Sequence, residues 1–369
     1  MKLSTTSATL LAQLGTVSRV ASTRSAVQAL SGVQVRAEEG HAELRATDME
    51  VGLRAPFEAE VERDGIAVLP ARLLLDVARA LPSGAATMEL RPSEGDVEIV
   101  SGSATFHIRT LRSEDFPPFP EPGGDQIVRV PTRAFVETAA KVARSASRDE
   151  TRPILTGILV SAAGSDLRMV ATDSYRLSVK ETQLESPLDG SFEANVPARA
   201  LQELIRIAQA GGDGEVAIGV RANQVVFDLD GIVLSSRLID GQFPNYRQLL
   251  PDTHEHDLTL RTHELTDVVR RMSLMAQKNA PLRLHFHEGE LKVSAQTPDV
   301  GEAHESLPVP FQGEPFEIGF NPDFLRDGLE SVDADDLRLK LISPLRPGLI
   351  EAGDDSGFQY LIMPIRLNV

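Results

Sequence analysis

A threefold internal repeat with a period near 125 residues limits the folds that this chain can adopt. Thr47, Thr172 and Thr297 are separated by 125 residues each time, and the first two belong to the phrase ATD, at 46–48 and 171–173. The phrase QTPD around the third threonine is a weaker echo. A repeat of this kind indicates that one supersecondary unit recurs, so that each copy forms a similar fold.

Two further markers follow in the same order in each copy. About 23 residues after each threonine, Pro70, Pro197 and Pro322 precede apolar residues at three- and four-residue spacing, which predicts a helix with a proline at its first position. A Phe-Pro or Met-Pro pair then closes each copy. Chance recurrence of such short words is the alternative, but three words in one order in three copies argue against it.

Each copy is expected to open with one more helix, over residues 8–21, 131–147 and 262–277. Between the helices lie short alternating segments such as DVEIVSG and LRLHFHEG, which predict strands separated by Gly- and Asp-bearing turns. Two helices and about eight antiparallel strands per copy predict an α+β fold. The predicted joins near 125 and 254 give domains over residues 1–124, 125–253 and 254–369.

Composition excludes several classes of protein. The 369 residues include no cysteine, so disulfides, thiolate catalysis and Cys-ligated metals are excluded, and a reducing cytoplasm fits. No stretch of 18 apolar residues predicts a membrane helix, and the N-terminus lacks the apolar core of a signal peptide. We therefore expect a cytoplasmic protein with no membrane association.

Charge is distributed unevenly along the chain. With 37 basic and 54 acidic residues the net charge is −17, which taken alone argues against a nucleic acid partner. The six expected helices, however, contain 11 basic and 8 acidic residues, so the excess of acid lies in the strands and loops. Such segregation permits phosphate binding on one surface. Ordinary ion pairs on a solvated helix face are the alternative, and charge alone favours them.

Motifs that carry catalysis are absent from the sequence. There is no Walker A loop, G-x-G-x-x-G, H-E-x-x-H or G-x-S-x-G. His285 and His287 share a strand face, as metal ligands do, but no third ligand is in view. Asp48 and Asp173 recur after a strand, where aspartate commonly caps backbone N–H groups, although a hydrolase using them remains an alternative. We expect no metal, no cofactor and no enzyme activity.

Essentially the whole chain resembles the bacterial DNA polymerase III beta subunits, the replicative sliding clamps. The resemblance rests on YLIMPIRL at 360–367, ATDSYRL at 171–177 and DGQFPNY at 240–246. It implies three DNA-clamp domains, each with two helices and two antiparallel sheets. It also implies a head-to-tail homodimer that closes into a ring around double-stranded DNA without reading its sequence.

The function that the resemblance implies is processivity. A non-catalytic clamp on DNA would tether the replicative polymerase, the clamp loader and repair proteins through their short linear motifs. The alternative from another class is a repeat-built interaction scaffold that never encircles DNA.

The resemblance also assigns residues to three sites. Loops that face the hole of the ring would contact DNA through Arg24, Arg148, Arg152 and Lys278. The dimer seam would join Phe106 and Ile108 of one chain to Ser273 and Leu274 of the other. The partner-peptide pocket, an apolar cleft with polar edges, would be formed by Leu155, Thr172, Ser174, Tyr175, Arg176, Leu177, Pro244, Leu249, Leu345, Leu361, Met363, Pro364, Ile365 and Arg366.

This chain departs from the family pattern at two places in the pocket. Ser174 and Tyr175 stand where the family often has Gly-His, so a bulkier rim is expected. Asn368 and Val369 extend past the usual Arg-Leu end, where they can reach the pocket edge. At the seam, Ser273 replaces a residue that is commonly apolar, so a less apolar seam is expected.

Overall fold

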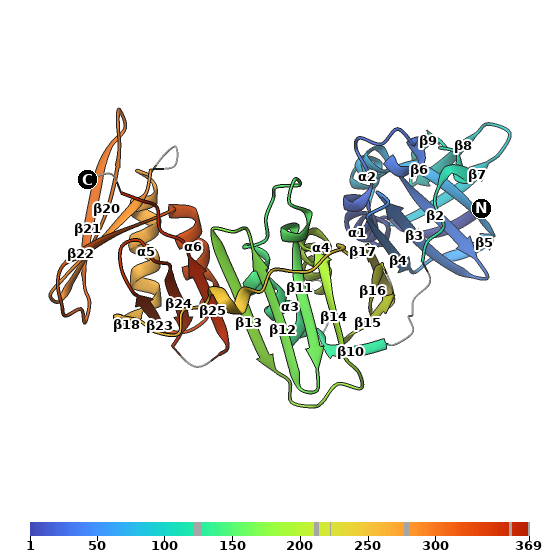
Figure 1. Ribbon diagram of the computed structural model, residues 1–369. Coiled ribbons are helices and arrows are strands. Elements are labelled where there is room, and N and C mark those ends of the chain that lie inside the picture. The colour runs from blue at the N-terminus through green and yellow to red at the C-terminus, as the bar shows by residue number, and fades with distance from the viewer. Residues whose placement is uncertain (121–126, 210–213, 222, 277–279, 354–355, 368–369) are drawn as a thin grey trace. The chain divides into compact units, whose positions relative to one another are not determined.

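The computed structural model describes residues 1–120, 127–209, 214–221, 223–276, 280–353 and 356–367. The chain divides into two compact units, which Figure 1 shows as ribbons. The first contains Met1–Arg133 and Glu203–Leu238, and the second contains Ala134–Gln202 and Ile239–Val369. The middle copy of the repeat therefore contributes strands to both units.

The first unit contains two antiparallel sheets. A five-stranded sheet has the order β5-β1-β7-β8-β9, and an eight-stranded sheet has the order β10-β15-β16-β17-β4-β3-β2-β6. The strands are β1 (Lys2–Thr6), β2 (Gly32–Glu38), β3 (His41–Thr47), β4 (Val51–Phe57), β5 (Glu60–Arg63), β6 (Gly65–Pro70), β7 (Ala85–Arg91), β8 (Asp96–Ser101), β9 (Ala104–Arg109), β10 (Ile127–Pro131), β15 (Glu215–Arg221), β16 (Gln224–Leu229) and β17 (Ile232–Arg237).

The second unit also has two antiparallel sheets. One has eight strands in the order β14-β11-β12-β13-β25-β24-β23-β18, and the other has four in the order β21-β20-β19-β22. The strands are β11 (Gly157–Ala163), β12 (Asp166–Thr172), β13 (Arg176–Gln183), β14 (Phe192–Pro197), β18 (His256–Arg261), β19 (Leu282–His287), β20 (Glu290–Thr297), β21 (Gly301–Pro308), β22 (Phe316–Phe320), β23 (Asp336–Leu341), β24 (Gly348–Ala352) and β25 (Phe358–Ile362).

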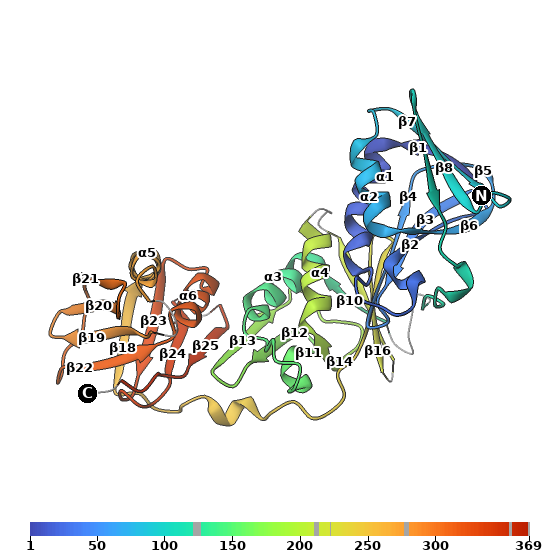
Figure 2. The ribbon, with the colours of Figure 1, turned by 90° about the horizontal axis from the view of Figure 1, so that it is seen from above.

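Two helices form in each copy, as the sequence predicts. Figure 2 shows α1 and α2 side by side in the first unit, and α5 and α6 side by side in the second. The helices are α1 (Ser7–Val17), α2 (Ala71–Ala80), α3 (Thr132–Ala143), α4 (Ala198–Gln209), α5 (Thr262–Ser273) and α6 (Pro322–Ser331). Apolar residues at helical spacing, such as Leu10, Leu14 and Val17 of α1, are fully buried, so the helices are held by the core.

The helix boundaries differ from the predicted ones in a consistent way. After α1 the chain tightens into a 3-10 turn, Ser18–Val20, and after α3 the backbone N–H of Ser145 donates to the Val142 carbonyl, so the α-helices end before residues 21 and 147. Pro322 is the first residue of α6, as predicted. Pro70 and Pro197 instead lie one residue before α2 and α4 begin, where a missing N–H costs nothing.

Neighbouring copies of the repeat join as continuous sheets. In the first unit β4 pairs with β17, from Arg54 opposite Val233 to Val51 opposite Ser236. In the second unit β13 pairs with β25 over five residue pairs. In the third copy β21 corresponds to β4 and β13, and in the first copy β9 corresponds to β17 and β25. Within the part of the chain that the structure describes, β9 and β21 are edge strands.

Candidate functional site

A tight turn between β12 and β13 carries several of the residues assigned to the pocket. Thr172 is buried, and its hydroxyl donates to the Arg176 carbonyl at 2.7 Å. The Asp173 carboxylate accepts from the backbone N–H groups of Tyr175 and Arg176 at 2.9 and 3.0 Å. Ser174 adopts a left-handed conformation with φ of 79°, which is strained for a residue with a Cβ. These bonds hold Ser174 and Tyr175 out from the sheet.

The first copy repeats this turn between β3 and β4. Asp48 accepts from the backbone N–H groups of Glu50 and Val51 at 3.0 and 2.9 Å, and Met49 has the same φ of 79°. The prediction that the recurring aspartates cap backbone N–H groups is confirmed. This geometry does not favour the alternative of a hydrolase, because both carboxylates are engaged in hydrogen bonds to the backbone of their own turns.

Arg176 fastens the turn to helix α6. Its guanidinium is largely buried and forms ion pairs with Asp173 at 3.1 Å and with Asp327 at 2.6 Å. It also lies over the Phe324 ring, 4.3 Å from the centroid. Burial, the largest influence, disfavours the charged form, but Tyr360 and Asp327 outweigh it and the pKa of Arg176 is raised. Arg176 therefore stays charged and supports the rim from beneath.

Apolar residues from β13 and β25, neighbours in one eight-stranded sheet, form a floor beside the turn. Leu177 of β13 lies opposite Leu361 of β25 in the strand pairing. Both belong to a buried cluster with Val170, Val179, Tyr246 and Leu349, against which Leu159, Phe243 and Leu250 pack. Sequence reasoning named Leu177 and Leu361 but missed the others. In the sequence they look like core residues, and only the strand pairing brings them together.

Four of the residues assigned to the pocket have exposed apolar side chains. Tyr175, Leu249, Leu345 and Met363 are between 42% and 60% exposed. The Met363 N–H donates to the Tyr175 carbonyl at 2.8 Å, which fixes the C-terminal segment beside the turn. Tyr175 and Met363 thus lie side by side next to Leu177 and Leu361, and such a pair marks a binding surface better than a single exposed residue does.

Two hollows flank the floor. One, of about 290 Å³, is lined by Pro244 together with Leu159, Val170, Phe243 and Tyr246. The other, of about 400 Å³, is lined by Leu249 and the residues around it and by the loop that contains Arg346 and Pro347. Both hollows also have polar linings, with Arg168 and Glu193 in the first and Arg346 in the second, so each suits a ligand or peptide that carries both apolar and polar groups.

The remaining pocket assignments lie around the same turn or the chain end. Leu155 is half-buried in a 3-10 turn, Pro153–Thr156, where its carbonyl accepts from the Ser147 N–H. Pro364 and Ile365 are half-buried and Arg366 is exposed. The Ile365 N–H donates to the Gly319 carbonyl at 2.7 Å, which ties the tail to β22. Asn368 and Val369 fall outside the described residues.

Arg152, which was assigned to DNA, is hydrogen-bonded to the turn that carries Ser174 and Tyr175. Its guanidinium donates to the Ser174 hydroxyl at 3.1 Å and to the Asp173 carbonyl at 3.3 Å. It also pairs with Asp149 at 3.0 Å. Hydrogen bonds from Thr151, followed by those from Arg152, lower the pKa of Asp149. Sequence reasoning missed these bonds because Arg152 and Ser174 lie in different loops.

The other residues assigned to DNA are differently placed. Arg24 and Arg148 are exposed, and neither side chain has a partner among the residues that the structure describes. Lys278 lies outside the described residues. Exposed cations on loops suit phosphate contacts, which need no fixed geometry.

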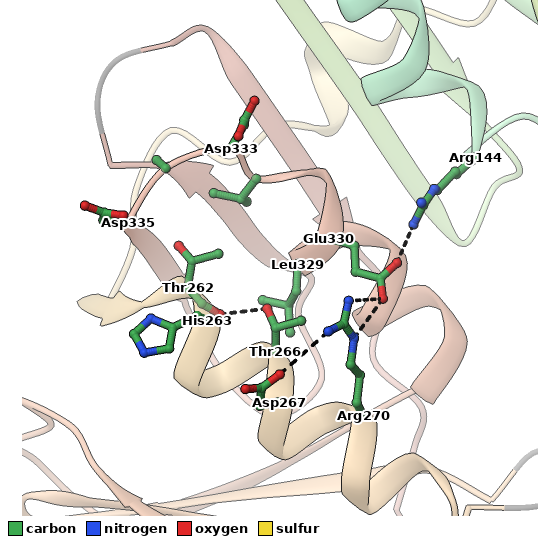
Figure 3. A pocket seen from close by; sticks show the side chains of 12 residues that line it. Arg144, Thr262, His263, Thr266, Asp267, Arg270, Leu329, Glu330, Asp333 and Asp335 are labelled. Atoms are coloured by element: carbon green, nitrogen blue, oxygen red, sulfur yellow. Dashed lines mark hydrogen bonds and ion pairs between the residues drawn. The ribbon is translucent and has the colours of Figure 1, made fainter. Parts of the chain in front are cut away.

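A polar cavity of about 590 Å³ lies between the end of α3 and helices α5 and α6 (Figure 3). Figure 3 shows Arg144 and Arg270 converging on Glu330, at 2.7 and 2.9 Å. Hydrogen bonding from Arg144, more than that from Arg270, lowers the pKa of Glu330. Part of the basic charge counted on the helices is therefore neutralised by ion pairs, so it is not all available for phosphate.

The histidine pair shows no sign of a complete metal site. The rings of His285 and His287 stack on β19 with centroids 4.4 Å apart. Among the described residues, no group of three His, Asp or Glu side chains is placed to hold a metal ion. In the same residues no helix is both long and apolar enough to cross a membrane.

The residues assigned to the dimer seam lie in a strand of the first unit and at the end of a helix of the second unit. Phe106 and Ile108 belong to edge strand β9. Ser273 ends α5 and its hydroxyl donates to the Val269 carbonyl at 2.6 Å. Leu274 follows at once and is 74% exposed, the most exposed large apolar side chain among the described residues.

Comparison with known proteins gives a consistent picture across the chain. Residues 1–120, 129–245 and 247–366 match the N-terminal, central and C-terminal domain models of the DNA polymerase III beta subunit. The beta sliding clamp of Streptomyces coelicolor is 33% identical over 350 residues, 92% of each chain. That of Synechocystis is 33% identical over the whole of both chains.

Solved structures are similar over the full length. The DNA polymerase sliding clamp of Bacillus subtilis has a TM-score of 0.92 at 26% identity, with 100% of both chains covered. The sliding clamp of Pseudomonas aeruginosa bound to griselimycin has a TM-score of 0.91 at 27% identity, with the same coverage. The expected α+β fold of three clamp domains is thus confirmed.

Proposed function

Because this chain belongs to the family of DNA polymerase III beta subunits, the bacterial sliding clamps, we propose that it encircles double-stranded DNA and tethers the replicative polymerase to it. The clamp loader and repair proteins would share the same tether. The relatives' names favour this function over an interaction scaffold that never encircles DNA.

The observation that carries the proposal is the place that two edge strands, β9 and β21, take in the repeat. Inside the chain, β4 pairs with β17 and β13 pairs with β25, so the middle copy pairs with a neighbouring copy at both of its ends. Among the eight edge strands of the described residues, β9 and β21 are the two that occupy the matching positions in the first and third copies. Exposed strand edges recruit other strands. Pairing β9 of one chain with β21 of another, twice, closes a head-to-tail homodimer.

A ring of this kind holds DNA by topology. It requires only weak attraction to phosphates, which any sequence supplies. Exposed Arg24 and Arg148 suit such contacts, and Lys278 and Arg152 are proposed as further contacts. The acidic remainder of the chain discourages DNA from binding the outside. No step of this function needs a cofactor or a reaction, so we propose a non-catalytic cytoplasmic protein that acts on the nucleoid.

The buried floor of Leu177, Leu361 and Tyr246, with Tyr175 and Met363 exposed beside it, forms a groove in the second unit. This groove suits the partners that the clamp would tether. A short peptide with a Leu or Phe anchor would bury that side chain against the floor of Leu177, Leu361 and Tyr246. Met363 at the edge is flexible and adapts to several partners. Tyr175, in place of a smaller residue, presents a broad apolar face beside it.

Solution mass tests the ring against the scaffold. We expect light scattering at micromolar concentration to give twice the chain mass of 40.0 kDa, because both free edges are then paired. A monomer at these concentrations would contradict the ring and favour the scaffold.

A further inference from the structure

The proposed function makes no use of two histidines on strand β19. His285 and His287 are two residues apart on this strand, which lies inside the four-stranded sheet of the second unit. Leu284 and Phe286, which alternate with them, are fully buried. His285 and His287 therefore share the face of the sheet that points away from the core, where both are half-buried.

The two imidazole rings lie at the separation that one metal ion requires. Their centroids are 4.4 Å apart and their planes are inclined by 23°. Imidazole nitrogens bind a divalent ion such as zinc at about 2.0–2.1 Å, so two rings at adjacent coordination positions have centres roughly 4.5 Å apart. The backbone therefore needs no adjustment. Rotation about χ2, a torsion with broad preferences, is enough to turn one nitrogen of each ring toward a shared point.

One of the ring nitrogens lacks a hydrogen-bond partner. Nε2 of His287 is covered from solvent, yet no donor or acceptor among the described residues contacts it. A covered polar atom without a partner costs free energy, which a bond to a ligand removes. Rotation of the ring about χ2 would bring this nitrogen out of its covered position without breaking a hydrogen bond at Nε2.

The neighbouring strands supply charge of both signs. Glu290 of β20 lies opposite His287, and Lys292 lies opposite His285. Glu317 of β22 also lies opposite His285, and it forms an ion pair with an arginine of β19. Affinity for a cation has to come from the imidazoles, because these neighbouring charges balance. No third His, Asp or Glu in the described part of the chain is placed to complete the site.

We propose that His285 and His287 together bind one divalent transition metal ion, with water in the remaining coordination positions. Two imidazoles with oxygen ligands suit the tetragonal geometry of Cu²⁺ or Ni²⁺, and copper binds nitrogen sites most tightly among the first-row divalent ions. Calcium and magnesium prefer oxygen ligands and would not bind here. Strand β19 holds both rings side by side before the ion arrives, so the second imidazole binds at a high effective concentration.

A second pair with the same spacing provides a matched control within the chain. His254 and His256 are also two residues apart, and His256 begins β18. The His256 ring packs against the rings of Phe311 and Phe316, with centroids 4.8 and 5.2 Å away. An imidazole packed between two phenyl rings is not free to turn toward a neighbouring histidine. Spacing alone therefore predicts two metal sites, whereas the ring contacts predict one.

Titration of the full chain with copper chloride tests the site. With glycine present to compete for weak binding at single histidines, calorimetry is expected to show one tightly bound Cu²⁺ per chain. His285→Gln and His287→Gln should each weaken this binding by about tenfold or more, because either change removes one arm of the chelate. His254→Gln should leave it unchanged. Electron paramagnetic resonance of the copper-loaded wild type counts the bound nitrogens without any substitution, and two are expected.

The outcomes decide the site independently of the ring. The proposal is overturned if the wild type binds no copper in the presence of glycine, or if it binds copper no more tightly than His285→Gln and His287→Gln do. A resonance spectrum with one bound nitrogen, or an equal loss in His254→Gln, overturns it as well. None of these measurements depends on dimerisation or DNA, so failure of the metal site leaves the proposed function intact.

Discussion

Replacing Arg176 with alanine is expected to loosen the join between β13 and β25, and with it the groove. The guanidinium is largely buried and donates to Asp173 and Asp327, which are themselves mostly buried. Removing one partner of a buried ion pair costs about 3–5 kcal/mol, because the charge left behind has lost its counterion. Arg144 remains within 3.5 Å of Asp327 and offsets part of that loss. We therefore expect about 3 kcal/mol.

Hydrogen exchange on the Leu177 and Tyr360 strands measures this loss locally, as the free energy of opening of the β13–β25 amides. Arg176→Lys is the control. A lysine keeps the charge but cannot bridge two carboxylates and stack on Phe324, so an intermediate loss is expected. In Arg176→Ala/Asp327→Ala the loss should fall below the sum of the single losses. If Arg176→Ala lowers the free energy of opening of the β13–β25 amides by less than about 1 kcal/mol, the reasoning that Arg176 stabilises the pairing of these strands is refuted.

Three further predictions concern peptide binding in the groove, the ion pairs of Glu330, and DNA binding. Met363→Ala is expected to weaken binding of a Leu/Phe-containing polymerase tail about tenfold, measured by fluorescence anisotropy, because it removes an exposed apolar wall. Glu330→Gln should lower the melting temperature at pH 7. Because hydrogen bonding to Arg144 and Arg270 lowers the folded pKa of Glu330, its contribution is complete above its unfolded pKa, near 4.3, and is lost as the pH falls through the lower folded value, so the difference shrinks as the pH falls below about 4. Arg24→Ala with Arg148→Ala should reduce the salt dependence of binding to a short duplex by about two ions, measured by titration at several salt concentrations.

Each of these has a control and a contradicting result. Met49→Ala leaves the peptide affinity unchanged, and an equal effect of Met363→Ala and Met49→Ala would show that the groove is misplaced. A melting difference for Glu330→Gln that does not shrink as the pH falls below the unfolded pKa would contradict the ion-pair argument. An unchanged salt slope would remove Arg24 and Arg148 from the DNA contacts.

The sequence predicted the parts of the fold that repeat. Asp48 and Asp173 could be recognised as turn formers, because the same phrase followed a strand in two copies and aspartate caps such turns locally. The helices could be predicted equally well, from the three- and four-residue spacing of their apolar residues. These features depend on residues that are near in sequence, where chemistry and spacing are visible together.

The candidate groove was only partly predictable. Arg176 and Asp327 are 151 residues apart, and each looks like an ordinary surface charge until β13 and β25 pair. Tyr246 and Val170 are buried in one cluster, and only the fold brings them together beside the first hollow. Arg152 was assigned from a resemblance, and its bonds to the Ser174 turn depend on how two loops meet. Domain limits at 124 and 253 and the site assignments remain predictions.

The central claim is that the chain is held on DNA by closure of a ring. The direct measurement is retention of the protein, loaded by a clamp loader, on a nicked circular plasmid before and after one cut by a restriction enzyme. We predict that the protein stays with the circle during gel filtration and leaves within minutes of linearisation, because it slides off the free ends. Equal retention on circular and linear DNA would contradict the account.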